Sequence, residues 1–512
     1  MADRLPPAAA VSGGRLWYRS DMSAREKGVV AAGHPLTAEA GARVLREGGN
    51  AVDAAVAAML MSFAAESLLT GMGAGGHMLV AGGEWEPALL DFFVEAPTRL
   101  GDGSEAELQA VDVSFGVTAQ VFHIGPASCA VYGSPAGVCE AVRRWGTVPL
   151  GELAEPAAKV AREGVTVNAG QAYVAEILTD LLCSTPECAA LWAPAGRILR
   201  EGEVLRNPEL SDALLMLARE GAEPFYAGEV ARAVCDWLRS HGGSLTPEDL
   251  SGYRAVVRRP IRMAYRDCEV LTNPPPSAGG TLLAYSLALL GRGPSPPTLS
   301  GVLDAMASAQ SERTPAFVEG LAEEGFLERF LLRRLGSTTH VSVLDAAGRA
   351  CSVTCTNGEG SGVVVPGTGL HLNNVMGEQD LNPLGFHRHP AGRRMPSMMS
   401  PSIVMREGHA ELVLGSAGSN RIRSAILQTI VGVVDHGMGA REAVDAPRVH
   451  LEDGVLYSEP GIDLDELGDR GFEVVSFDAL NLFFGGVQAV QLRAGALTGA
   501  GDPRRGGVAV SV

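Results

Sequence analysis

Two short segments in the second half of the chain alternate regularly between apolar and polar residues. They are residues 337–343 and 350–356, and Asp-Ala-Ala-Gly at 345–348 lies between them. Such alternation is typical of strands with two different faces, and the glycine-containing connection predicts a β-hairpin. A hairpin symmetric about Ala347 has three polar pairs: Ser342 with Ser352, His340 with Thr354, and Thr338 with Thr356.

One face of this hairpin is expected to be apolar, and the other to carry hydroxyl groups. The apolar face consists of Val341, Val343, Cys351, Val353 and Cys355. The hydroxyl row ends at Thr338, with Thr356 within cross-strand reach, so Thr338 is a candidate nucleophile. Threonine is also simply a good strand residue. The pattern alone does not decide between these two interpretations.

The beginning of the chain predicts two consecutive helices. A helix over residues 37–47 stops at Gly48-Gly49, and Asn50 is a suitable N-cap for a second helix over residues 51–67. This second helix is apolar nearly all round, which predicts burial. A glycine cluster, residues 71–76, follows it. Because a dinucleotide fingerprint follows a strand and not a helix, we interpret the cluster as close backbone packing.

Later segments predict a mixture of further helices and strands. Residues 136–237 look mostly helical, Thr246 with the following proline marks a helix start, and residues 281–290 predict an apolar helix. Strands are expected at residues 363–365, 370–374, 402–405 and 411–414. The chain is therefore expected to fold as a mixed α/β (α+β) protein.

A glycine-containing loop, residues 415–420, precedes a predicted helix over residues 421–435. The backbone N–H groups at such a helix start attract negative charge, and both phosphate and a developing oxyanion are candidates. The loop lacks the Gly-Lys-Ser/Thr ending of a phosphate-binding P-loop. An oxyanion site is therefore the better interpretation.

Composition and charge exclude several classes of function. Lys and Arg number 41 and Asp and Glu 59 among the 512 residues, so the formal net charge is −18. This acidic balance argues against a nucleic-acid partner. Residues 1–10 are too short an apolar run for a signal peptide, and the apolar stretch 54–65 is bounded by Asp53 and Glu66. We therefore expect a cytoplasmic protein without a membrane partner.

Metal and cofactor chemistry is not expected. The eight cysteines show no zinc spacing, although Cys183 and Cys188 are close enough to bridge a short loop. Four histidines in the second half tempt a metal interpretation, but no carboxylate spacing supports one: His340, His371, His387 and His389.

Several motifs together resemble the γ-glutamyltranspeptidase family. In the second half they are Thr338-Thr339-His340, Gly362-Val363-Val364-Val365-Pro366-Gly367, Leu372-Asn373-Asn374-Val375-Met376, Met399-Ser400-Pro401 and Asp502-Pro503-Arg504. The segments 48–55, 246–250 and 274–280 extend the resemblance into the first half. It runs from about residue 33 to residue 505, in the order found in the family.

The resemblance implies an N-terminal nucleophile hydrolase with a four-layer αββα sandwich. It also implies self-cleavage between Ser337 and Thr338 into two subunits of one precursor. Residues 1–32 are then an N-terminal extension, 33–337 the large subunit and 338–512 the small subunit. How many processed pairs associate is left open.

The same resemblance assigns the catalytic roles. Cleavage frees the α-amino group of Thr338, which then serves as base for its own hydroxyl, a poor nucleophile without one. Thr356 orients that hydroxyl. The N–H groups of Gly418 and Ser419 form the oxyanion hole, with Ser419 in the place of a second glycine.

The substrate-binding residues depart from the family pattern. Phe93 stands where an arginine binds the α-carboxylate of the glutamyl group, and Met398 replaces the second of two serines, of which Ser397 remains. Glu378 replaces the aspartate that binds the substrate amino group, and Val375 stands where some relatives have a polar amide. Asn357 is a further candidate contact with the substrate.

Losing a bidentate carboxylate clamp costs several kcal/mol of binding to that group. Arg393 or Arg394 could substitute for the missing arginine, although a surface position is the more usual place for such residues.

Two functions therefore follow from the residues and the resemblance. The first is an acyl-enzyme hydrolase or transferase that attacks a γ-glutamyl or related small amide through Thr338. The alternative is a family member of secondary metabolism, such as antibiotic biosynthesis, that hydrolyses a different bond. That bond would be a C–C bond of a modified amino acid or a non-glutamyl amide such as a β-lactam side chain. A catalytically inactive binding protein is disfavoured by the intact Thr338, Thr356 and glycine loop.

Overall fold

The fold is that of a computed structural model, which describes residues 26–98, 107–114, 119–311, 339–379, 381–382, 385–468 and 470–512. Ser337 and Thr338 lie outside these ranges. No helix in the described part of the chain is long and apolar enough to cross a membrane.

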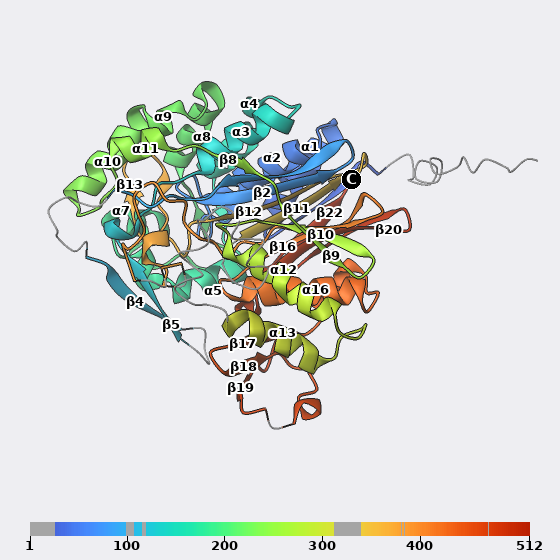
Figure 1. Ribbon diagram of the computed structural model, residues 1–512. Helices are drawn as coiled ribbons and strands as arrows, with labels where there is room; N and C mark the ends of the chain where they lie inside the picture. The colour runs from blue at the N-terminus through green and yellow to red at the C-terminus, as the bar shows by residue number, and fades with distance from the viewer. Residues whose placement is uncertain are drawn as a thin grey trace, which may run out of the picture.

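Two β-sheets form the centre of the molecule (Figure 1). The first has seven strands in the order β22 (Val508–Ser511), β1 (Gly28–Ala32), β11 (Thr339–Asp345), β12 (Arg349–Thr356), β2 (Gly75–Gly82), β3 (Trp85–Phe92) and β8 (Val256–Arg258). The second has six, in the order β21 (Ala496–Gly501), β20 (Gly486–Arg493), β16 (His409–Ala417), β15 (Ser402–Arg406), β10 (Cys268–Thr272) and β9 (Ile261–Tyr265). The expected mixture of helix and sheet is confirmed.

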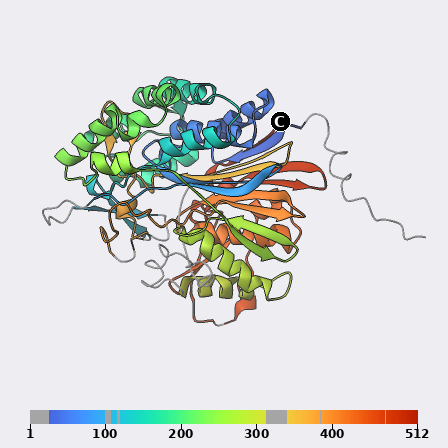
Figure 2. The same cartoon turned by 45° about the horizontal axis from the view of Figure 1, so that its top comes forward.

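The sheets pack face to face, and helices cover their outer faces (Figure 2). Helices α1 (Pro35–Glu47), α2 (Ala51–Ala65) and α3 (Ser134–Trp145) lie on the seven-stranded sheet, with α4 (Leu150–Glu163) and α8 (Pro208–Glu220) beyond them. Helices α12 (Ala278–Gly291), α13 (Leu299–Ser311), α16 (Arg421–Val434) and α17 (Ala440–Asp445) lie on the side of the six-stranded sheet. An apolar cluster that includes Leu79, Leu89, Ile403 and Val413 fills the space between the sheets.

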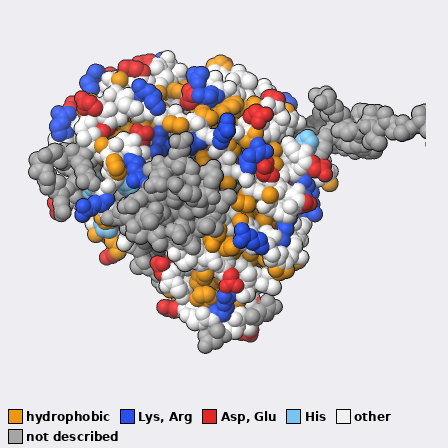
Figure 3. Space-filling model, viewed as in Figure 1, with side chains coloured by type: hydrophobic (Ala, Val, Ile, Leu, Met, Phe, Trp, Pro, Cys, Tyr) orange, Lys and Arg blue, Asp and Glu red, His pale blue; other side chains and the backbone are white. Residues whose placement is uncertain are grey.

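Shorter elements surround this centre. The helices are α5 (Ala169–Ile177), α6 (Thr179–Leu182), α7 (Pro186–Trp192), α9 (Glu223–Tyr226), α10 (Glu229–Ser240) and α11 (Pro247–Gly252). The strands are β4 (Gln109–Ser114), β5 (Ala119–Ile124), β6 (Val165–Thr166), β7 (Val204–Leu205), β13 (Val364–Val365), β14 (Leu370–His371), β17 (Val449–Glu452), β18 (Val455–Ser458) and β19 (Glu473–Ser476). On the face seen in Figure 3, acidic and basic side chains are interspersed.

The local signals for helix ends in the sequence are confirmed. Asn50 caps α2 and forms a capping box with Asp53, and all fifteen residues of α2 are buried. Thr246 caps α11 in the same way, through Asp249. Helix α12 begins at Ala278, three residues before the expected start.

Residues Gly28–Ala32 form β1 between β22 and β11. One boundary differs from the expectation. Strand β16 continues to Ala417, because Ser416 and Ala417 pair with β20, so the glycine loop is only Gly418 to Asn420. A Cβ on Gly415 would lie 2.4 Å from the ring of His340, which explains a glycine inside this strand.

The glycine cluster at residues 71–76 is a site of close backbone packing, as expected. A Cβ on Gly73 would lie 2.4 Å from the carbonyl oxygen of His371, and a Cβ on Gly76 would lie 2.3 Å from that of Thr354. The glycines therefore allow the segment to pass directly against neighbouring backbone.

Candidate active site

The predicted hairpin register is confirmed. Strands β11 and β12 pair Ser342 with Ser352, His340 with Thr354 and Thr339 with Cys355. The apolar face of the hairpin, including Val341 and Cys351, packs into the same core as α2. The opposite face lies against the six-stranded sheet.

The polar row of the hairpin, which we define as His340, Ser342, Ser352 and Thr354, is completely enclosed between the two sheets. The Nδ1 atom of His340 lies 2.8 Å from the hydroxyl of Thr354, and Nε2 lies 2.9 Å from that of Ser342. The serines donate hydrogen bonds across the gap, from Ser342 to the carbonyl of Gln488 and from Ser352 to that of Leu414, both at 3.0 Å. Burial lowers the pKa of His340 to about 3, so this imidazole is neutral at physiological pH.

Thr356 ends β12 and is buried. Its hydroxyl accepts a hydrogen bond of 2.8 Å from the N–H of Gly358. Gly358 has a positive φ of 66°, and a Cβ there would lie 2.4 Å from an oxygen of Glu378. The tight turn after Thr356 therefore brings Glu378 close to the end of the hairpin.

The loop from Gly418 to Asn420 connects β16 to α16 in an unusual backbone conformation. Gly418 has a φ of 117°, and Ser419 has a φ of 52°, a left-handed value that is uncommon for a residue with a side chain. The Asn420 amide donates a hydrogen bond to Glu452 on β17. Because a strained backbone persists only where its surroundings impose it, this loop conformation is a candidate functional feature.

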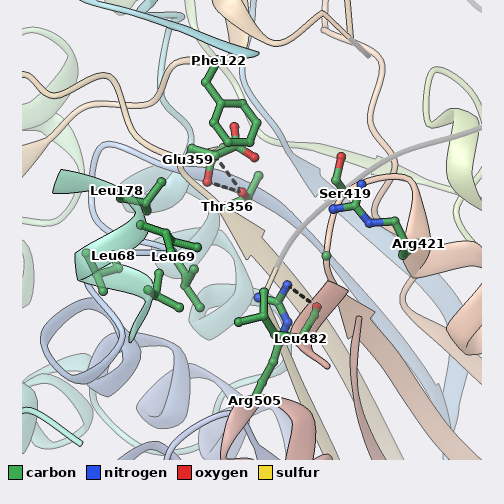
Figure 4. A pocket seen from close by; sticks show the side chains of 14 residues that line it. Leu68, Leu69, Phe122, Leu178, Thr356, Glu359, Ser419, Arg421, Leu482 and Arg505 are labelled. Atoms are coloured by element: carbon green, nitrogen blue, oxygen red, sulfur yellow. Dashed lines mark hydrogen bonds between the residues drawn. The ribbon is translucent and has the colours of Figure 1, made fainter. Parts of the chain in front are cut away.

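Thr356, Gly418 and Ser419 line one pocket, shown in Figure 4. Most of its wall is apolar and comes from distant segments: Leu68, Leu69, Phe122, Val174, Ile177, Leu178 and Leu482. Its charged groups are Glu359, Arg421 and Arg505. The structure therefore joins three of the four predicted catalytic residues, and the fourth, Thr338, is outside the described ranges.

Phe93 and Met398 lie in an apolar cluster and do not line this pocket. We call it the Phe93 cluster; its buried members include Phe93, Val375, Met376, Met398 and Met399. Three positions at which the sequence departs from the family pattern, 93, 375 and 398, thus belong to one cluster. Phe93 and Met398 are completely buried. All three positions therefore contribute to apolar packing.

Arg394 is not a surface residue, contrary to our expectation, and it does not line the pocket of Thr356. It is 8% exposed and donates hydrogen bonds to the carbonyl of Phe93 and the hydroxyl of Tyr253. It also forms an ion pair of 3.0 Å with Glu95. The two terminal nitrogens of its guanidinium are therefore bound within the protein, while the neighbouring Arg393 is half-buried.

The two polar residues Asn357 and Ser397 are held by backbone contacts. The amide of Asn357 donates to the carbonyl of His371 at 3.3 Å. The hydroxyl of Ser397 accepts from the N–H of Met399 at 3.1 Å. Neither residue lines the pocket of Thr356.

Sequence reasoning missed Glu66, Arg421 and Arg505, which reach the site from the end of α2, the start of α16 and the end of the chain. Glu66 lines a second pocket next to the first, together with Thr339, and accepts a hydrogen bond of 2.6 Å from Thr37. Burial raises the pKa of Glu66 to about 7, although its bonds with Thr37 and Thr339 and the charge of Arg505 oppose this shift. The Arg504-Arg505 pair beside the Asp-Pro motif was the available sequence signal.

Comparison with known proteins finds relatives that match most of the chain. The family model described as gamma-glutamyltranspeptidase matches residues 37–324 and 330–512. The chain is similar to the acylase ACY 1 proenzyme of Pseudomonas sp. (strain V22), with 34% identity over 95% of this chain and 94% of the relative. It is also similar to the glutathione hydrolase proenzyme of Escherichia coli (strain K12), with 30% identity over 98% and 94% of the two chains.

Among solved structures, the fold is similar to the crystal structure of cephalosporin acylase from Bacillus halodurans. The TM-score is 0.81 with 25% identity, and the match covers 99% of each chain. These relatives are enzymes, and the chain belongs to the γ-glutamyltranspeptidase family.

Proposed function

We propose that the protein is a self-cleaving amide hydrolase of the N-terminal nucleophile type, with Thr338 as nucleophile. Continuing the hairpin register by one residue would place Thr338 opposite Thr356, at the pocket that Gly418 and Ser419 also line. The sequence of helix, sheet, sheet and helix layers corresponds to the αββα sandwich of that class. The proenzyme names of both curated relatives also support processing.

The chemistry begins with cleavage of the precursor. The hydroxyl of Thr338 attacks the carbonyl carbon of Ser337, the peptide C–N bond breaks, and the α-amino group of Thr338 takes the proton. Water then hydrolyses the resulting ester and leaves a carboxylate on Ser337. The freed amine is the base that Thr338 needs for each later turnover.

In turnover, the hydroxyl of Thr338 gives its proton to this amine and attacks the substrate amide. The N–H groups of Gly418 and Ser419 stabilise the oxyanion of the tetrahedral intermediate. The amine product leaves with the proton, and water hydrolyses the acyl ester. A second amine in place of water gives transfer.

The processed halves would remain associated. The small subunit, residues 338–512, contributes β11 and β12, which pair with β1 and β2 from the part of the chain before the cut. The apolar core and the ladder hydrogen bonds both cross this boundary. The expected product is a tight pair of subunits.

The substrate we propose is a non-glutamyl amide, so the protein acts as an acylase. The Phe93 cluster carries this proposal, because it places apolar side chains at the positions where the family binds the charged ends of a glutamyl group. The α-carboxylate of a glutamyl substrate would find no arginine at position 93, and its binding would be weaker by several kcal/mol. The similarity to the acylases supports the same choice.

A γ-glutamyl amide is the second candidate substrate, and one observation favours it. Glu378 is retained as an acid, is buried, and lies against the Gly358 turn beside Thr356. A carboxylate at this place can bind a substrate amino group.

A substrate panel on the purified protein tests the proposal. Expression of wild type should give two bands in place of the 53.3 kDa precursor, with a new N-terminal threonine, and Thr338→Ala should remain intact and inactive. Phenylacetyl and hexanoyl p-nitroanilides should be hydrolysed with kcat/KM about 100-fold above that for γ-glutamyl p-nitroanilide, from a lost clamp of about 3 kcal/mol. Preferred turnover of the γ-glutamyl anilide would exclude the acylase, and an active Thr338→Ala variant would exclude the mechanism.

A further inference from the structure

Two arginine side chains, those of Arg421 and Arg505, share the pocket of Thr356. In the described part of the chain, no ion pair joins Arg421 or Arg505 to an acid. The nearby acid Asp502 is already paired with Arg448 at 2.7 Å and with Arg504 at 3.2 Å. The two guanidinium groups therefore leave positive charge at the pocket.

Both guanidinium groups are held in place by backbone. The Nε–H of Arg421 donates to the carbonyl of Phe483 at 3.1 Å, and its guanidinium lies over the Phe483 ring. Arg505 donates to the carbonyl of Leu482 at 3.3 Å. A Cβ on Gly486 would lie 2.4 Å from the side chain of Arg505, so this arginine is closely packed and its position is fixed before any ligand arrives.

Arg505 has unused binding capacity. Its Nε atom is buried and has no hydrogen-bond partner among the described residues, which is costly for a charged donor. Burial lowers the pKa of Arg505 to about 10, and the charge of Arg421 adds to this shift, against the opposing effect of Asp502, Glu359 and Glu66. An anion bound between the arginines would supply the missing partner.

The rest of the wall has the opposite character. Figure 4 shows Leu68, Leu69 and Leu178 across the pocket from Arg421. Glu359 is the remaining charged group of the wall, next to Thr356. A ligand that fits this pocket has an apolar body that contacts the leucines and one acidic group that reaches the arginines.

We propose that Arg505 and Arg421 form a carboxylate-binding subsite of the pocket, so that the substrate is an amide with an apolar body and a free carboxylate. The statement that the bound molecule is a substrate rests on the proposed function, whereas the binding subsite itself rests only on the pocket. The carboxylate can belong to the acyl part or to the amine part, because the geometry of the described residues fits either.

Binding of unreactive ligands tests the subsite without requiring turnover. Calorimetry on the purified wild-type protein compares 4-phenylbutyrate with 4-phenylbutanamide, which has the same body and no charge. The acid should bind at least about 10-fold more tightly. Arg505→Gln should weaken the acid about 10- to 100-fold and leave the amide unchanged, and Arg505→Lys should recover part of the loss.

The matched control is Arg493→Gln, which removes an exposed arginine of β20 and should change neither affinity. Equal affinity for acid and amide in wild type, or equal loss of both in Arg505→Gln, would overturn the subsite. Two pairs of substrates then locate the carboxylate. Comparing kcat/KM for 4-carboxybutanoyl and pentanoyl anilides tests the acyl side. Comparing amides of 4-aminobenzoate with the same amides of aniline tests the amine side. Preferential binding of the acid without turnover of any amide would uphold the subsite and refute the proposed function.

Discussion

Replacing Phe93 by arginine would restore one side chain of the family's carboxylate anchor without restoring the site around it. The new guanidinium would enter the Phe93 cluster, in which Phe93 is completely buried and Val375, Met398 and Met399 are its apolar neighbours. The variant thus shows whether an arginine at position 93 is enough for carboxylate binding, or whether polar surroundings are also needed.

The expected cost follows from the available partners. Two acids lie two residues from Phe93 in sequence, and Glu95 is already paired with Arg394 at 3.0 Å. Asp91 accepts from Arg258 at 2.7 Å, lies 3.8 Å from Arg394 and also accepts the N–H of Phe93. These cations hold the pKa of Asp91 at about 2 despite its burial, so it is already fully compensated. A further buried charge without its own partner costs about 3–5 kcal/mol. In a chain of this size, each kcal/mol of lost stability lowers the thermal midpoint by about 2–4 °C or somewhat less. The midpoint of Phe93→Arg should therefore fall by roughly 5–15 °C.

Thermal unfolding by circular dichroism and hydrolysis of γ-glutamyl p-nitroanilide measure the two consequences. Phe93→Arg should unfold earlier and gain less than about 10-fold in kcat/KM, whereas Phe93→Leu, the apolar control, should lose only about 1 kcal/mol. The triple variant with Val375→Gln and Met398→Ser should gain more than the single changes combined, because the three positions are in one cluster. An unchanged midpoint together with strong γ-glutamyl turnover in Phe93→Arg alone would refute this reasoning.

Three further changes test other parts of the site. Ser419→Gly keeps the backbone N–H and relieves a positive φ, so activity should persist and stability should stay within about 1 kcal/mol of wild type. Ser419→Pro removes the N–H donor and should lower kcat by about 100- to 1,000-fold. Asn420→Ala removes the bond to Glu452 and should lower kcat about 10-fold at unchanged KM, and an unchanged kcat would show that the bond does not position the loop. Burial raises the pKa of Glu66 to about 7, so its ionisation lowers the stability of the wild-type protein as pH rises from about 4.5 to 7. Glu66→Gln cannot ionise. Its stability relative to wild type, followed through the thermal midpoint, should therefore rise over that pH range by roughly 3 kcal/mol. A pH-independent difference would contradict the raised pKa.

Local patterns in the sequence were sufficient for the parts of the fold that local physics determines. The register of the hairpin followed from the alternation around Ala347, and the starts of α2 and α11 followed from their capping residues. The end of β16 did not, because Gly415 resembles a loop residue until the ring of His340 is seen to require the space. Interactions between sheets are not visible in a local pattern.

The candidate site was predictable to the extent that motifs carry it. Thr356, Gly418 and Ser419 were named from the sequence and do line one pocket. The arginines and leucines of that pocket come from segments hundreds of residues apart, and no spacing rule brings them together. The role of Arg394 was also missed, since its partners Tyr253 and Glu95 are likewise remote in sequence.

The enclosed polar row has a consequence for how the protein matures. If β11 slipped by one residue along β12, His340 and Ser342 would turn toward the helices, and valines would face the carbonyl of Gln488 instead. Each buried group left unbonded costs about 1–3 kcal/mol, so the two sheets would not close tightly in the slipped form. On the proposed mechanism, the same slip displaces position 338 from Thr356, and a misassembled precursor would stay uncut. Appearance of the shorter fragments therefore reports that the two sheets have assembled in the correct alignment.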